Sequence, residues 1–575
     1  MSLYIKFKDK IRSMAEFDVV VVGGGHHGLI AACYLAKQGM SVVILERRHE
    51  VGGGLCTEEV TLPGFRHNLH SFFYGHSAAI WVRDLEQYTY GPIYIKPPVV
   101  LGNPHSDGKC IVLYTRDLEK SAESLSRLSK KDAQAYKALQ EQFMEMLVKG
   151  LIWLEDYCPP IPSEERASLL EKSEMGREYL RLINMTPEQL IRERFEHHNI
   201  IGCILANYSF ATVWHDVPDP RGWIVKNPTW LCRGKEFTRG GSHGVAHALT
   251  RFLYKHGGTV MESTEVNKII VKDGRAVGVR TVDGKEIGAR KAVISAVDPW
   301  QTFLRFVGEE NLDSEFVKKV KGIKPSTRSG LFGVHLALRE PPKYTSAKFN
   351  PDMDRAFCLV IGYEEPEDVD NIARDTEEGI PPGWKGSRSK PAAECTVPTL
   401  FDPSQAPAGK HTAFMWQYAP YTLKDGGAEK WDEIKEEYAD IVVERWREYA
   451  PNLTKDNIIA RYVYSTYDYS KKLINMREAD QGVVGVESPE QLYDKRPLKE
   501  LSQYRTPIKG LYLTGAGTHV CAGITGAGGY NVAGVVCDDL GVKTWWPRAD
   551  VRKIYLGLKD FTYQNEIRSI FLPSA

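Results

Sequence analysis

The chain has 575 residues, which is enough for two or more domains with large hydrophobic cores. Its 74 basic and 74 acidic residues cancel, so the charge does not favour a nucleic acid as partner. The ten cysteines include no CxxC pair, and no apolar run reaches the roughly 18 residues of a membrane-spanning helix. We therefore expect a cytoplasmic protein without a disulfide framework or a bound metal.

Residues 1–16 precede the first predicted strand. Their apolar side chains mostly share one helical face, and most of their lysines lie off it. Two interpretations stay open: a short helix that rests on a membrane surface, which allows peripheral membrane association, or an extension ahead of the first domain.

The stretch 18–54 has the pattern strand, glycine turn, helix, strand. Residues 18–22, four of them valine, predict a central parallel strand that is buried on both faces. Gly23, Gly25 and Gly28 follow in GxGxxG spacing. In a dinucleotide-binding unit the first glycine makes the tight turn, the second admits the pyrophosphate and the third lets the helix pack on the strand. The helix N-terminus then offers N–H groups to the phosphates.

Glu46 ends the second predicted strand, eighteen residues after Gly28. A carboxylate at this place accepts hydrogen bonds from the ribose hydroxyls and repels a 2′-phosphate. The complete unit predicts an α/β fold with a Rossmann-type dinucleotide site. We find no second βαβ unit with its own GxGxxG, so we expect no separate NAD(P)H domain.

The middle of the chain alternates helical and strand patterns. Thr186, Pro187 and Gln189 predict a capped helix start. Helices are also predicted within 115–150, 237–258 and 428–449. The stretch 258–299 reads as strands and hairpins, with turns at Asp273-Gly274 and Asp283-Gly284 and a last strand at 293–296. The composition of 207–230 and 340–397 favours loops.

Residues 506–540 read as a strand, a glycine turn, a glycine-rich loop and a helix. A late unit of this kind can return to the first domain and complete a cofactor site made from both ends of the chain. Its glycines allow the backbone to approach a flat ligand closely.

Together these stretches resemble the phytoene-desaturase-like flavoproteins, which belong to the amine-oxidase-like class of FAD enzymes. The GHHGL sequence at 25–29 is closest to the GHNGL variant of that family. Gly54 replaces a common arginine, and Thr525-Gly526 replaces a proline of the carotenoid desaturases, so the resemblance implies FAD without implying a carotenoid. The matching segments, whose strong motifs cover about a fifth of the chain, are 21–39, 46–59, 63–65, 239–249, 401–412 and 504–531.

The resemblance implies non-covalently bound FAD. The glycine turn would hold the pyrophosphate, Glu46 the adenosine ribose and Val266 the adenine. The segment 515–518 would reach the phosphates or ribityl chain, and the loop 524–531 would lie against the isoalloxazine ring. The full set of expected cofactor contacts is Gly23, Gly25, His26, His27, Gly28, Glu46, Arg47, Gly52, Gly53, Gly54, Leu55, Val266, Gly515, Ala516, Thr518, Ile524, Thr525, Gly526 and Asn531.

We expect two intertwined domains with two short extensions. The FAD-binding domain would be assembled from 17–110, 234–310 and 495–548. A mixed α+β substrate domain would take 111–233 and 311–494. Residues 1–16 and 549–575 would form the N-terminal and C-terminal extensions.

FAD accepts a hydride, and removal of the accompanying proton from a saturated C–C bond needs a base. His70 and His519 are the candidate bases, because their segments flank the expected flavin position. For both, the alternative is a structural histidine that is hydrogen-bonded within the fold. His215, beside Trp214, is a weaker third candidate.

The leading hypothesis is an FAD-dependent dehydrogenase that introduces C=C bonds into an apolar alicyclic or isoprenoid molecule and passes electrons to O2 or a quinone-like acceptor. Three alternatives stay open: oxidation of a C–N bond, as in amine oxidases, redox-neutral isomerisation of a double bond, and a flavoprotein that serves as an interaction partner. An aromatic pocket that requires a basic amine would favour the amine oxidase, and an apolar pocket without a carboxylate would favour the dehydrogenase. A dimer is compatible with each of them.

Overall fold

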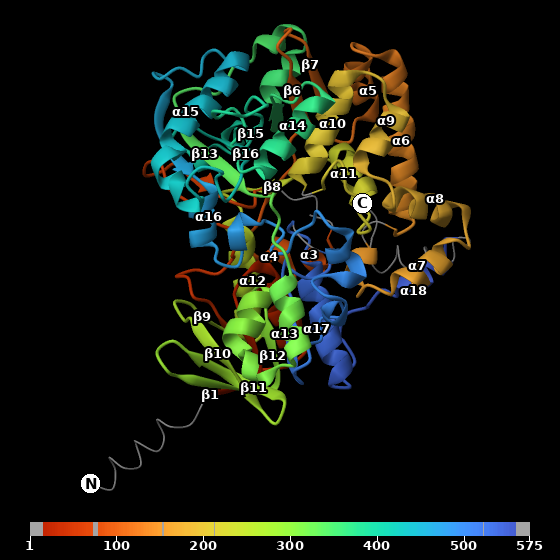
Figure 1. Cartoon of the computed structure of the whole chain (residues 1–575), viewed down its shortest axis with the longest axis vertical. Coiled ribbons are helices and arrows are strands. Elements are labelled where there is room, and N and C mark those ends of the chain that lie inside the picture. Colours follow the sequence, from red (N-terminus) through yellow and green to blue (C-terminus); the bar gives the residue numbers. More distant parts are fainter. Residues whose placement is uncertain (1–14, 73–78, 152–153, 212, 521–522, 559–575) are drawn as a thin grey trace.

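Two seven-stranded sheets organise the computed structural model, which describes residues 15–558 except 73–78, 152–153, 212 and 521–522. Figure 1 shows the first sheet at the lower end of the molecule and the second sheet at the upper end. Residues 1–14 lie outside the described residues, so both interpretations of the N-terminal segment stay open. None of the helices in the described part of the chain is long and apolar enough to cross a membrane.

The first sheet has a parallel core that is extended by an antiparallel hairpin. The core order is β18-β12-β1-β2-β9, and β10 and β11 continue from the other half of β12. The predicted hairpin turn at Asp273-Gly274 is confirmed, because both residues have positive φ between β10 and β11. The strands are β1 (Ala15–Val22), β2 (Val42–Leu45), β9 (Thr259–Met261), β10 (Val266–Lys272), β11 (Arg275–Thr281), β12 (Glu286–Ser295) and β18 (Leu511–Leu513).

The valines of β1 are buried on alternate faces, as the sequence predicts. Val19 and Val21 face the core that contains the helices α2 (His26–Lys37), α12 (His243–Lys255) and α17 (Ala527–Asp539). Val20 and Val22 face a π-helical segment, Gln301–Val307, and α13 (Ser314–Gly322). The late strand and helix therefore do return to the first sheet, and the predicted Rossmann-type architecture is confirmed.

The second sheet is antiparallel except where β14 runs parallel to β6, in the order β17-β13-β16-β15-β14-β6-β7. Residues 99–110, predicted as part of the FAD-binding domain, belong to this sheet because β6 pairs with β14. The prediction of loops at 340–397 is wrong for β14 and β15, which are fully buried strands. The strands are β6 (Val99–Pro104), β7 (Cys110–Tyr114), β13 (Leu331–Leu338), β14 (Cys358–Ile361), β15 (Ala393–Thr396), β16 (His411–Tyr418) and β17 (Ile458–Tyr464).

One face of the second sheet is covered by α15 (Trp431–Tyr449), whose apolar stripe packs on β13 and β16. The other face belongs to the same core as a group of helices contributed mainly by residues 118–233. Figure 1 shows most of these helices beside the upper sheet, with α7 lower down. They are α5 (Leu118–Ser126), α6 (Lys130–Val148), α7 (Ser163–Leu170), α8 (Glu174–Ile183), α9 (Pro187–Arg194), α10 (His198–Phe210) and α11 (Trp223–Arg233).

Most of the predicted helices are confirmed. The capping box of Thr186 and Gln189 begins α9 with both reciprocal hydrogen bonds in place. The prediction of loops at 207–230 is wrong for α11, which contains Pro228. Pro228 lacks the N–H that would bond the Ile224 carbonyl, and the Tyr208 hydroxyl of α10 donates to that carbonyl instead, at 2.5 Å.

Short elements complete the described chain. β3 and β4 form one two-stranded sheet, and β5 and β8 form another. The predicted domain boundaries all stay predictions. These elements are β3 (Thr57–Glu58), β4 (His67–Asn68), β5 (Tyr94–Ile95), β8 (Phe237–Thr238), α3 (Ile80–Asp84), α4 (Gln87–Tyr90), α14 (Pro366–Glu377), α16 (Thr466–Lys472) and α18 (Val551–Leu556).

Candidate active site

The turn between β1 and α2 has room for a ligand on one side and none on the other. Gly23 has φ +97°, which favours glycine. A Cβ at Gly28 would lie 2.3 Å from the Gly23 carbonyl oxygen, so this residue must be glycine for α2 to pack on β1. A Cβ at Gly25 would meet no atom within 4 Å. The turn therefore leaves open the position at which a pyrophosphate would approach.

Glu46 is fixed beside this turn by the backbone. Its Oε2 accepts a hydrogen bond from Gly24 N–H at 2.8 Å, and its Oε1 accepts one from Arg48 N–H at 2.9 Å. The carboxylate lines a cavity of about 120 Å³ at the carboxyl end of β1. A carboxylate so oriented suits the hydroxyls of a ribose.

The same cavity contains further predicted contacts and several that the sequence did not reveal. Gly23, Gly25, Arg47, Gly53 and Val266 line it, as expected. The π-helical segment also contributes, and so does the chain just after α16. No motif marks these additional residues, which are Gln301, Arg305, Phe306, Lys472 and Asn475.

The glycine doublet at 52–53 packs directly on the first turn. Gly52 N–H donates to the Gly24 carbonyl at 2.8 Å, and Gly52 has φ +120°. A Cβ on Gly53 would lie 3.1 Å from Gly25 Cα. Gly54 faces Ser71 and His70, and Leu55 is buried beneath the doublet. The predicted segment is therefore a second wall beside the turn.

The late loop reaches the same region from the C-terminal end of β18. Gly515 has φ +116° and lies against Ala296 at the end of β12. The hydroxyl of Thr518 donates to the Gly515 carbonyl at 2.8 Å. Arg496, which the sequence did not single out, is buried and donates to the carbonyls of Ala516 at 2.9 Å and Thr518 at 3.1 Å. This arginine holds the loop in its folded position.

Other predicted contacts connect the loop to neighbouring helices. Trp81 Nε1 and the Tyr157 hydroxyl each donate to the Thr525 carbonyl at 2.9 Å. Gly526, with φ +69°, precedes α17 and has no space for a Cβ beside Trp81. Asn531 Nδ2 donates to the Asp156 carbonyl at 2.9 Å.

Several buried polar atoms near both glycine segments have no hydrogen-bond partner in the described part of the chain. These atoms are His26 Nε2, His27 Nε2, Thr525 Oγ1 and Asn531 Oδ1. Buried groups of this kind usually have partners, so the site fits a polar ligand such as FAD. Burial lowers the pKa of His26 to about 4, so its imidazole is neutral. His27 Nδ1 accepts a hydrogen bond from Gly529 N–H at 3.3 Å, which joins the first turn to α17.

A second cavity, of about 110 Å³, lies between the late loop and the second sheet. Gly523 and Ile524 form part of one wall. Aromatic side chains from the helices and the sheet dominate the rest. They are Phe72, Phe210, Trp223, Trp230, Trp416, Tyr418 and Tyr469. We call this space the aromatic cavity.

His70 lines the aromatic cavity, whereas His519 does not. The pKa of His70 is held well below its usual value by burial and then by the cations Lys472 and Arg48, so its imidazole is neutral. Its Nε2 lies 3.3 Å from the Tyr464 hydroxyl, and its Nδ1 has no partner among the described residues. His519 is buried edge-on to Tyr493, and burial lowers its pKa as well. The catalytic roles of both histidines stay predictions.

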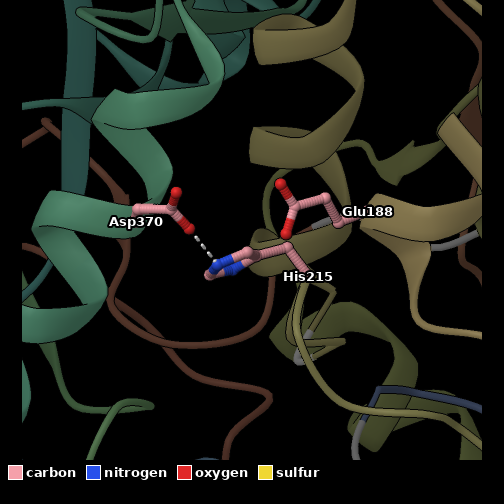
Figure 2. A group of neighbouring side chains, drawn as sticks. All are labelled: Glu188, His215 and Asp370. Atoms are coloured by element: carbon pink, nitrogen blue, oxygen red, sulfur yellow. Dashed lines mark hydrogen bonds and ion pairs between the residues drawn. The ribbon is translucent and has the colours of Figure 1, made fainter. Parts of the chain in front are cut away.

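The third candidate, His215, lies elsewhere. Figure 2 shows His215 beside Glu188 of α9 and Asp370 of α14. Its Nε2 is 2.5 Å from Asp370 Oδ1, and one ligand atom from each of the three residues lies within 4.8 Å of the others. The sequence contains no metal-binding pattern, and Arg192 already pairs with Glu188 at 2.7 Å. We interpret the group as a polar link between the loop, α9 and α14.

Comparison with known proteins identifies the family. The model of the FAD dependent oxidoreductase family matches residues 18–364, more than half of the chain. The chain belongs to this family. It is therefore an enzyme with FAD as cofactor, and the predicted resemblance to phytoene-desaturase-like flavoproteins is confirmed.

Several relatives align along almost the whole chain. One of the subunits of the limonene dehydrogenase of Castellaniella defragrans is 32% identical over 549 residues, covering 93% of this chain and 97% of the relative. A lycopene-forming phytoene desaturase of Pseudescherichia vulneris is 21% identical over 561 residues, covering 91% of this chain and 99% of the relative. Among solved structures, a putrescine oxidase has a TM-score of 0.58 at 14% identity and covers 92% of this chain and all of its own. This last likeness shows the fold alone.

Proposed function

We propose that this FAD-dependent oxidoreductase introduces a C=C bond into an apolar alicyclic or isoprenoid substrate. The observation that carries the proposal is the aromatic cavity, whose wall includes the late loop expected to lie against the flavin. Apolar cavities with a few placed polar groups are typical of small-molecule sites. The similarity to a limonene dehydrogenase and a phytoene desaturase supports a substrate of this kind.

Bound FAD supplies the acceptor for a hydride. The protein must hold the substrate and take up the accompanying proton. We propose His70 for the proton, because it lines the cavity as a neutral imidazole whose Nδ1 has no partner among the described residues. His519 is the second candidate, and its position outside the cavity wall makes it a less direct one.

Oxidation of an amine is the main alternative, and one carboxylate in the cavity bears on it. Glu394 lines the aromatic cavity, but Lys235 Nζ pairs with its Oε1 at 2.8 Å. The pair has no net charge, so it gives a substrate ammonium group no counter-ion. This neutrality favours the dehydrogenase over an amine oxidase.

The electron acceptor is part of the proposal. Among the described strands, neighbours that run parallel to each other belong to the first sheet. The exception is the pair of β6 and β14 in the second sheet. That sheet carries the site already assigned to FAD. We therefore propose O2 or a quinone-like molecule as acceptor, with redox-neutral isomerisation as the alternative that needs none.

The test is the visible flavin spectrum of the purified enzyme, followed without oxygen while alicyclic and isoprenoid hydrocarbons and their amine analogues are added. Loss of the flavin band with the hydrocarbons supports the proposal. If only the amines remove the flavin band, amine oxidation replaces the proposed dehydrogenation. A band that only dithionite removes would favour isomerisation or a non-enzymatic role. His70→Gln should slow the bleaching without altering the oxidised spectrum.

A further inference from the structure

The aromatic cavity contains one buried ion pair that the proposed reaction does not use. Glu394 lies on β15, and Lys235 precedes β8. Each side chain is 3% exposed, and Lys235 Nζ lies 2.8 Å from Glu394 Oε1. Glu394 faces the cavity among rings from the sheet and the helices.

Stability does not account for such a pair. Removal of two charges from water opposes their attraction, and replacement of a buried ion pair by apolar residues of similar size is often neutral or stabilising. A buried ionised pair in a cavity wall is therefore a candidate for a functional role.

Two other polar groups in the same cavity already donate to backbone carbonyls, and His70 is the residue proposed to take up the proton. The Tyr418 hydroxyl donates to the Ser209 carbonyl, and Gln481 Nε2 donates to the Ser329 carbonyl at 2.8 Å. Glu394 pairs in register with Trp416 of β16, so its carboxylate lies on the sheet wall of the cavity. It is the acidic side chain in that wall.

The state of the pair defines the group that it can bind. Burial alone would lower the pKa of Lys235, but the adjacent Cys358 thiol and the Glu394 carboxylate outweigh burial and raise it. A lysine ammonium paired with a carboxylate carries no net charge. A carboxylate has about four acceptor positions on its two oxygens, and the Lys235 ammonium and the Cys358 thiol use two of them. A neutral hydroxyl can donate a hydrogen bond to one of the acceptor positions that remain on the carboxylate. An ammonium group would add an uncompensated buried charge.

We propose that Glu394 accepts a hydrogen bond from one hydroxyl group of an otherwise apolar alicyclic substrate. Glu394 is the specificity-determining residue, and Lys235 is a positioning residue that holds the carboxylate in place. The inference rests on the proposed function only in taking the aromatic cavity as the substrate chamber.

The test measures binding rather than turnover. Oxidised holoenzyme is equilibrated with methylcyclohexane or cyclohexylmethanol, and the free ligand is measured by headspace gas chromatography. The quantity compared is the ratio of the two dissociation constants. A site built to bond a hydroxyl discriminates against the analogue without it, so the double variant Lys235→Met/Glu394→Leu should shift this ratio against the alcohol by about 10-fold or more.

Phe210→Leu is the matched control, because Phe210 lines the same cavity without a polar group. It should weaken both ligands and leave their ratio within about 3-fold, since it removes only apolar contact. A double variant that keeps the wild-type ratio, or a control that shifts it equally, would overturn the assignment.

A measurement on the wild-type enzyme keeps the proposal testable if the double variant does not fold. Cyclohexylmethylamine, a cation at neutral pH, should bind at least about 10-fold more weakly than the alcohol, because the ion pair is neutral overall. Tighter binding of the amine would refute the hydroxyl site. If hydrocarbons bleach the flavin while this selectivity is absent, only the inference fails. If selectivity is present without bleaching by any substrate, only the proposed function fails.

Discussion

Gly25 and Gly28 should respond in opposite ways to the same added methyl group. In Gly28→Ala the new Cβ would lie 2.3 Å from the Gly23 carbonyl oxygen and 3.0 Å from Ala296 Cβ. The backbone must move, and overpacking of this kind costs about 1–3 kcal/mol. In Gly25→Ala the Cβ meets no atom within 4 Å, and the native φ of −64° suits alanine. Without FAD, its stability should change by less than about 0.5 kcal/mol.

For FAD binding we expect the opposite order, with the large effect in Gly25→Ala. The methyl of Gly25→Ala would occupy the position proposed for the pyrophosphate and separate it from the N–H groups of the turn. A hydrogen bond to a charged group contributes about 1.5–3 kcal/mol, so loss of two weakens binding by about 3–6 kcal/mol. Because each 1.4 kcal/mol is about tenfold, FAD affinity should fall at least about 100-fold.

The assay combines FAD titration by flavin fluorescence with thermal unfolding, with and without added FAD. Gly25→Ala should unfold like wild type when FAD is absent and lose the stabilisation that FAD gives. Gly28→Ala should unfold at a lower temperature in both conditions. The reasoning would be refuted if Gly25→Ala bound FAD like wild type, or if it destabilised the FAD-free protein as much as Gly28→Ala.

Two further predictions concern buried carboxylates. Glu46→Gln should weaken FAD binding about 10-fold, because an amide cannot accept on both sides as Glu46 does from Gly24 and Arg48; flavin release on dilution measures this. Burial raises the pKa of Asp298 to about 6, above the value of about 4 for an unfolded aspartate. The folded state therefore binds more protons between these values, and wild type should lose stability relative to Asp298→Asn as pH rises from about 4 to about 6. Equal differences in urea midpoint at acidic and neutral pH would contradict this.

Composition misled the prediction in the middle of the chain. Residues 340–397 are rich in Pro, Glu and Asp, yet β14 and β15 are buried strands of four residues each. Strands this short have too few positions to show a period, and their pairing with β6 and β16 decides their structure. Likewise, Pro228 lies inside α11 because tertiary packing outweighs its helix-breaking tendency.

Features whose causes are local could be predicted from the amino-acid sequence. The GxGxxG turn, the acidic end of β2 and the capping box of Thr186 depend on residues close together in the chain, so their patterns identify the βαβ unit and its dinucleotide. Family resemblance then extended this to FAD and to the late glycine loop.

Which distant residues share a cavity became visible in the folded chain alone. Lys235 and Glu394 are 159 positions apart, and Arg496 reaches the late loop through carbonyls that no motif marks. The same folding placed His70 in the aromatic cavity and His519 away from its wall, although both segments flank the expected flavin position. Contacts of this kind depend on how the two sheets and their helices pack, and packing between distant segments leaves no periodic or spaced pattern in the sequence.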